Sequence, residues 1–124
     1  MRSRVLHVPL FIGVIALCGC QTYQRDLDRA ATHYQENRHP EALALLKVLE
    51  GDTDSLSTVE RARYAYFRGM ANFRLEKRRE ARHWLGRAAA NEKLYPNSLS
   101  KDEKERADQI LAELNEARYG GASP

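Results

Sequence analysis

Two cysteines one residue apart, Cys18 and Cys20, carry the side chains near the start of the sequence that are best suited to covalent chemistry. They close a short apolar run that begins after Arg2 and Arg4. The run is shorter than the roughly 20 residues that a membrane-spanning helix needs. A positive start, a short apolar stretch and the small residue Gly19 therefore predict an export signal that ends at these cysteines.

The residues around the cysteines make this signal more specific. Leu17, Gly19 and Cys20 stand in an order that resembles the lipobox, the signal of bacterial lipoproteins. Cys18 occupies a position where that pattern usually has alanine or serine. The resemblance implies cleavage before Cys20, a diacylglycerol on its thiol and a further acyl chain, such as palmitate, on its amine. Two or three buried chains would hold the protein firmly to a membrane.

The residue after Cys20 bears on localisation in bacteria with two membranes. In the family that the signal resembles, aspartate at this place favours retention at the inner membrane, and this chain has Gln21. The resemblance therefore implies a lipid anchor in the outer membrane, on its periplasmic face. The alternative is a plain secretory signal or a short anchor in which both cysteines are incidental.

No other set of side chains has the spacing of a catalytic or metal site. His33, His39 and His83, the histidines that remain after such a cleavage, share no metal-ligand spacing. Asp52 and Asp54 lack the further ligands of a calcium loop. The sequence also has no glycine-rich phosphate loop and no serine elbow. We therefore expect neither an enzyme nor a bound metal or cofactor.

The charge of the chain gives little reason to expect a nucleic acid as partner. It has 20 lysines and arginines against 17 aspartates and glutamates, and Arg2 and Arg4 would leave with the signal. The remainder is nearly balanced, whereas nucleic-acid binding needs a clustered basic face. Acylation would also consume the single remaining cysteine, so no disulfide could form and packing alone must stabilise the fold.

The body of the chain has the composition and periodicity of an all-α protein. Alanine, leucine, glutamate and arginine dominate, and apolar residues recur at three- and four-residue steps. Four breaks separate five such stretches: 37–40, 51–55, 76–79 and 94–97. Ser57 with Glu60, and Ser100 with Glu103, have the spacing of capping boxes. The clearest apolar stripe, in the fifth helix, consists of Ala107, Ile110, Leu111, Leu114 and Ala117.

These breaks divide the sequence into a predicted signal peptide over 1–19, a helical domain over 20–119 and a flexible tail over 120–124. The first four helices of the domain form two similar pairs. A single shift along the sequence places Ala30 on Gly69, Tyr34 on Phe73, Ala42 on Ala81 and Leu46 on Leu85.

In this spacing the pairs resemble tetratricopeptide repeats, in which a small residue of the first helix lets the second helix pack closely. The resemblance implies a short solenoid of about two helical hairpins, with the fifth helix as a cap. Arg68 and Ala65 depart from it, because they stand where the family usually has leucine and tryptophan. The shift between the pairs is also longer than the repeat of roughly 34 residues that the family has. An unrelated five-helix bundle is the alternative.

The same resemblance implies a binding surface, because the first helices of tetratricopeptide pairs line a concave face. The implied partner-binding residues are Tyr34, Arg63, Tyr66, Met70, Phe73 and Arg74, with Gln35 at the edge. Aromatic side chains with arginine are typical of a peptide-binding hot spot. The alternative is that Tyr66, Met70 and Phe73 belong to the core, because apolar stripes of helices usually pack inward.

Together these features predict a membrane-anchored scaffold or assembly factor, a periplasmic adaptor that holds an envelope protein or peptide. One alternative is a pilotin-like lipoprotein that delivers or stabilises an outer-membrane channel subunit of a secretion system or pilus. A purely structural envelope protein is another. Two hairpins bury little surface on their own, so the sequence also leaves room for a homodimer.

Overall fold

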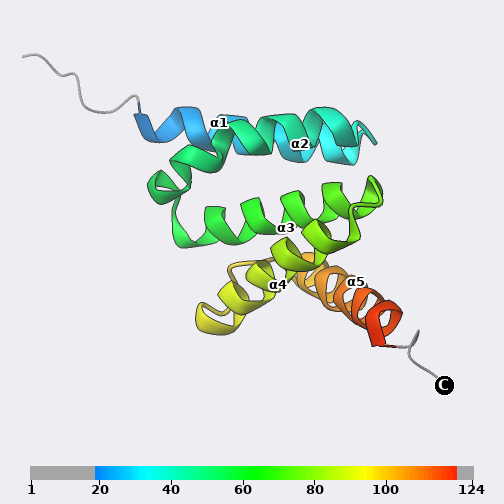
Figure 1. Ribbon diagram of the computed structural model, residues 1–124. Coiled ribbons are helices and arrows are strands. Elements are labelled where there is room, and N and C mark those ends of the chain that lie inside the picture. Colours follow the sequence, from blue (N-terminus) through cyan, green and yellow to red (C-terminus); the bar gives the residue numbers. More distant parts are fainter. Residues whose placement is uncertain (1–18, 120–124) are drawn as a thin grey trace, which may run out of the picture.

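The computed structural model describes residues 19–119, which form a chain of helices (Figure 1). The helices are α1 (Gly19–Gln35), α2 (His39–Val48), the 3-10 helix η1 (Leu49–Ser55), α3 (Thr58–Arg74), α4 (Arg78–Leu94) and α5 (Lys101–Tyr119). No strand occurs among these residues, so the all-α prediction is confirmed. The signal predicted before Gly19 and the tail predicted after Tyr119 lie outside the described residues. None of the described helices is long and apolar enough to cross a membrane.

Consecutive helices pack against one another, α1 on α2, α2 on α3, α3 on α4 and α4 on α5. Helix α3 also contacts α1 and α5, so it lies at the centre of the bundle (Figure 1). Each α-helix contributes one of the largest fully buried side chains, which are Leu27, Leu46, Met70, Leu85 and Leu114. The core therefore runs through all five α-helices.

The two helical hairpins turn in the same way. Asn37, between α1 and α2, has a φ of 62°, and Glu76, between α3 and α4, has a φ of 60°. In the first turn the amide of Arg38 donates to the carbonyl of His33 at 2.8 Å, and in the second turn the amide of Lys77 makes the equivalent bond at 2.9 Å. This is the pattern that ends a helix with one left-handed residue. The sequence repeat thus corresponds to a repeated local structure.

Replacing Glu76 with glycine should stabilise the chain by about 1 kcal/mol, because the left-handed conformation costs a residue with a Cβ roughly 1–2 kcal/mol. Glu76 is exposed, so little packing is lost. Urea unfolding followed by circular dichroism measures the gain. Asn37→Gly is the matched control, and its gain should be smaller because asparagine already tolerates this conformation. Equal gains at the two turns would contradict this explanation.

Helices α3 and α4 are in close contact at Gly69. A Cβ added to this glycine would lie 2.6 Å and 2.8 Å from Cγ and Cδ2 of Leu85, and 2.9 Å from its backbone nitrogen. Such separations are too short for real atoms, so only glycine fits here. In the first hairpin Ala30 and Leu46 occupy the equivalent positions, and both are fully buried. The small residue expected from the sequence therefore does let the second helix pack closely.

Both predicted capping boxes are present. The Ser57 hydroxyl accepts from the amide of Glu60 at 3.2 Å, and the Glu60 carboxylate accepts from the amide of Ser57 at 2.7 Å. The pair at the start of α5 makes the same two bonds. The predicted loop at 51–55 is wrong, because these residues belong to η1. Buried Leu49 and Leu56 hold the two ends of this segment, and short local bonds satisfy its backbone.

A buried carboxylate orders the connection from α4 to α5. Glu92 accepts from the amides of Asn97 and Leu99, both at 2.8 Å, and from the Ser98 hydroxyl at 3.0 Å. The bonds to the two amides hold the pKa of Glu92 below its ordinary value. These donors favour the ionised carboxylate of Glu92. Protonation of Glu92 at acidic pH should therefore weaken the connection between α4 and α5.

The buried stripe of α5 is shorter than the sequence predicts. Leu114 is fully buried, but Ala117 is exposed. The reason is the length of the neighbouring helix, since α4 begins at Arg78, whose guanidinium lies 3.7 Å from the carboxylate of Glu113. The last turn of α5 therefore extends past the helix that would cover it.

Candidate functional site

The residues that the sequence singled out for partner binding differ in accessibility. Tyr34, Tyr66 and Met70 are only 7%, 4% and 1% exposed, and all three belong to the core. Phe73 is half-buried and Arg74 is exposed. The alternative interpretation, a core role, therefore describes the position of Tyr66 and Met70, and Phe73 and Arg74 remain accessible to a partner.

Arg63 joins three helices on the side of the bundle where α3 meets α1 and α5. Its guanidinium lies 3.5 Å from the carboxylate of Asp28 on α1 and 3.8 Å from that of Glu103 on α5. It also lies 5.6 Å from the centre of the Phe67 ring. Arg63 is thus a structural link between the helices, and only part of its side chain is exposed. Its predicted contact with a partner, like the acylation of Cys20 in the first turn of α1, stays a prediction.

Tyr66 lies beneath this surface, near another buried tyrosine. Burial raises the pKa of Tyr66 to about 12, and the nearby Tyr34 contributes to the increase. The Tyr34 hydroxyl is itself buried without a hydrogen-bond partner among residues 19–119. The folded chain therefore favours the neutral form of Tyr66 over its anion.

Alkaline pH should destabilise the native chain more than a Tyr66→Phe variant. Because the pKa is raised in the folded state, its stabilising contribution is complete below the unfolded value near 10 and is lost as the pH rises toward about 12. Urea midpoints of the two chains across this range measure the effect. The Tyr64 hydroxyl, whose pKa burial also raises, is common to both chains. Parallel curves would contradict the assignment.

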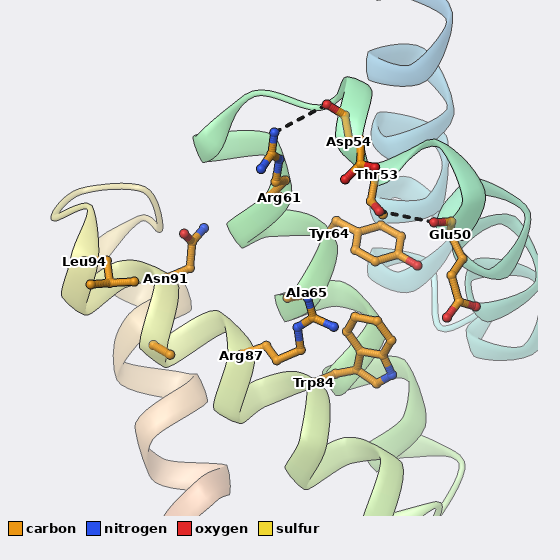
Figure 2. A pocket seen from close by; sticks show the side chains of 11 residues that line it. Glu50, Thr53, Asp54, Arg61, Tyr64, Ala65, Trp84, Arg87, Asn91 and Leu94 are labelled. Atoms are coloured by element: carbon orange, nitrogen blue, oxygen red, sulfur yellow. Dashed lines mark hydrogen bonds between the residues drawn. The ribbon is translucent and has the colours of Figure 1, made fainter.

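A second surface, which the sequence did not single out, contains a cavity of about 540 Å³ between η1, α3 and α4 (Figure 2). The lining residues are Glu50, Thr53, Asp54, Arg61, Tyr64, Ala65, Trp84, Arg87, Ala90, Asn91 and Leu94. This volume is in the range of small-ligand and peptide pockets. Aliphatic and aromatic residues form its floor, and charged residues stand around it.

Trp84 is the centre of the floor. The guanidinium carbons of Arg68 and Arg87 lie 4.1 Å and 5.1 Å from its ring centroid, within range of a cation–π interaction. The Tyr64 ring meets the same indole edge-on at 5.6 Å. Figure 2 shows the Arg87 side chain reaching from α4 to lie beside this ring. Arg87 is exposed and has no carboxylate within ion-pair distance among the described residues.

Arg68 is the least expected member of this group, because its residue is only 7% exposed. Its guanidinium donates to the Glu50 carboxylate at 2.9 Å and to the Tyr64 hydroxyl. That hydroxyl in turn donates to the carbonyl of Leu46 at 2.9 Å. These bonds connect α2 and η1 to α3 behind the cavity, and the stack on Trp84 connects them to α4.

Polar bonds also fix the open edge of the cavity. Arg61 donates to the backbone carbonyls of Leu56 and Asp54, at 3.0 Å and 3.4 Å. Asn91 of α4 donates to the carbonyl of Thr58 at 3.1 Å. Hydrogen bonds from both α3 and α4 therefore fix the mouth of the cavity. Leu94 lies beside the mouth and is 73% exposed.

The lining of this cavity combines polar and apolar side chains. Its polar groups are guanidiniums, carboxylates, hydroxyls and one amide. Within residues 19–119 no group of three or more potential ligands could hold a metal ion. An indole, a phenol and accessible guanidiniums are instead the groups that make strong contacts at protein interfaces. The spacing of Trp84 and Arg87, one helical turn apart, was the available sign of such a surface in the sequence.

Comparison of the chain with models of known protein families, with characterised proteins and with solved structures gives no match.

Proposed function

We propose that this chain is a lipid-anchored helical adaptor of the bacterial cell envelope, which holds another protein on a short tetratricopeptide-like scaffold. The scaffold is supported above all by the repeated hairpin turn, since both pairs of helices share the same hydrogen bond and the same left-handed residue at equivalent positions. The close approach at Gly69 adds to this support. The anchor rests on the resemblance of Leu17, Gly19 and Cys20 to a lipoprotein signal.

The surface proposed for the partner is the side of the bundle where α1, α3 and α5 meet. Helices α1 and α3 are the first helices of the two pairs, and α3 contacts both α1 and the capping helix α5. Half-buried Phe73 and exposed Arg74 offer an aromatic face beside a positive charge there. Arg74 also lies near His39, whose pKa is lowered by burial and by this arginine. An exposed arginine beside an aromatic ring is a common anchor for a peptide.

The anchor is tested by a pair of single substitutions in the intact precursor. With Cys20→Ser, a metabolic label of palmitate should be lost, and the protein should accumulate uncleaved or leave the membrane fraction. Cys18→Ser is the matched control and should keep both the label and the membrane association. Gln21→Asp should move the protein toward the inner membrane. An unlabelled protein that is cleaved normally would overturn the anchor.

The scaffold surface is tested by crosslinking in cell envelopes. A Phe73→Ala, Arg74→Glu chain should lose specific crosslinked partners that the native chain captures. Arg79→Glu serves as the control, because the Arg79 side chain is 90% exposed on α4 and lies outside this surface. If both chains capture the same proteins as the native one, the α1–α3–α5 surface is not the binding site.

A further inference from the structure

We propose that the cavity between η1, α3 and α4 is a second binding site, for a peptide segment that carries a carboxylate next to a large apolar side chain. This cavity is formed by different residues from those of the surface where α1, α3 and α5 meet. It depends neither on the lipid anchor nor on that surface. The occupant follows from the apolar floor and from the distribution of charge around it.

The apolar half of the ligand is indicated by the floor. Tyr64 and Trp84 present an aromatic corner, since their rings meet edge-on at 5.6 Å. Ala65 and Ala90 leave space beside this corner, and Leu94 stands exposed at the mouth. A volume of about 540 Å³ accommodates a bulky side chain together with a short stretch of backbone.

The carboxylate is indicated by Arg87. Its guanidinium is held against Trp84 at 5.1 Å and points along the cavity, yet it has no carboxylate partner among the described residues (Figure 2). Arg61 stands on the other wall, and its two bonds to carbonyls leave further donors of the guanidinium unused. Arginine is the side chain whose planar fork best matches a carboxylate.

Two acids also border the cavity, and they affect binding unequally. The Glu50 carboxylate is engaged by Arg68 at 2.9 Å, so its charge is largely compensated. Asp54 is exposed and has no ion pair among residues 19–119. An acidic ligand should therefore be attracted by Arg87 and repelled slightly by Asp54. Neutralising these two side chains should change the affinity for an acidic peptide in opposite directions.

The pair of Trp84 and Arg87 occurs in the second hairpin alone. Under the sequence shift that relates the two hairpins, Trp84 corresponds to Leu45 and Arg87 corresponds to Val48. The exposed fraction of Val48 is 74%, which is large for an apolar residue on that equivalent surface. The first hairpin thus folds without a tryptophan and an arginine at these two positions. This difference points to a separate role for Trp84 and Arg87.

Trp84 is the only tryptophan in the chain, so its fluorescence reports directly on the cavity. The probes are three tryptophan-free peptides, acetyl-GLEFEG-amide, acetyl-GLQFQG-amide and acetyl-GLKFKG-amide, titrated into the purified full chain in micelles of a detergent without aromatic groups. The acidic peptide should change the emission saturably and protect Trp84 from acrylamide quenching. It should bind at least about tenfold more tightly than the lysine peptide, which corresponds to one charge-assisted contact.

Variants then assign the contacts. Arg87→Gln should weaken the acidic peptide about tenfold, and Arg87→Lys should restore only part of the loss because lysine cannot make the bidentate contact. Asp54→Asn should tighten binding. Arg79→Gln, which removes the same charge from an exposed site elsewhere on α4, should leave it unchanged. Circular dichroism confirms that each variant is folded.

The proposal is overturned if none of the peptides alters Trp84 fluorescence, or if the lysine peptide binds best. It is also overturned if Arg79→Gln weakens the acidic peptide as much as Arg87→Gln, because the effect would then come from net charge. None of these results would affect the membrane anchor, which is measured separately through Cys20.

Discussion

A chain with alanine in place of Gly69 should unfold at a clearly lower urea concentration than the native chain. The new Cβ would lie within 3 Å of the Leu85 side chain and 2.9 Å from its backbone nitrogen. The leucine can rotate away, but its backbone cannot, so α3 and α4 must separate. Overpacking typically costs about 1–3 kcal/mol. Because alanine gains roughly 1 kcal/mol over glycine in a helix, we expect a net loss of about 1 kcal/mol, and at most about 2 kcal/mol.

The same substitution at Gly86 is the matched control for this prediction. Gly86 also lies inside a helix, but a Cβ there would meet nothing within 4 Å. Gly86→Ala should therefore stabilise the chain by roughly 1 kcal/mol, the gain in helix propensity. The two substitutions should shift the urea midpoint in opposite directions. A stabilising Gly69→Ala would show that the helices are farther apart than the structure has them.

Replacing Arg68 with alanine should destabilise the chain by about 3 kcal/mol. The substitution removes a long buried side chain and leaves a cavity, which typically costs about 2–5 kcal/mol in a core. It also removes a stack at 4.1 Å on Trp84, and cation–π contacts out of water contribute about 2 kcal/mol. Thermal unfolding followed by circular dichroism measures the total. These two estimates overlap and do not add in full.

Glu50→Gln tests the ion pair between Glu50 and Arg68 separately from the contact of Arg68 with the Trp84 ring. The Glu50 side chain is 56% exposed, so water can replace its bond to Arg68, and exposed pairs contribute up to about 1 kcal/mol. We therefore expect a much smaller loss than for Arg68→Ala. Arg68→Lys should behave more like alanine than like arginine, because lysine cannot stack on the indole while it reaches Glu50 and Tyr64. Equal losses in Glu50→Gln and Arg68→Ala would place the stabilisation in the ion pair.

Local features of the fold were predictable because short-range chemistry determines them. The capping boxes at Ser57 and Ser100 involve residues three positions apart, so their spacing alone predicts them. Close packing of the second helix at Gly69 was expected from the resemblance to tetratricopeptide repeats, and the structure identifies Leu85 as the contact. By contrast, the 3-10 helix after α2 was missed because its residues are polar, and the two leucines that anchor it act through tertiary packing.

The candidate sites were harder to predict, because an apolar stripe does not show whether its face meets another helix or a partner. Tyr66 and Met70 proved to be buried by neighbouring helices that are distant in sequence. Arg68 was noted only as a departure from the usual leucine, since burial of an arginine depends on partners that no local pattern supplies. Here those partners are Glu50, Tyr64 and Trp84, which lie on three different helices.

The central position of α3 determines how the chain opens. In an array of independent repeats, one end can melt while the other stays folded. Here α3 contacts every other α-helix of the described chain, so detaching either α1 and α2 or α4 and α5 uncovers one side of it. The amide protons of α3 should therefore exchange with deuterium only when the whole domain unfolds, at a rate set by global stability. Those in the last turn of α5, beyond buried Leu114, should exchange through local fraying.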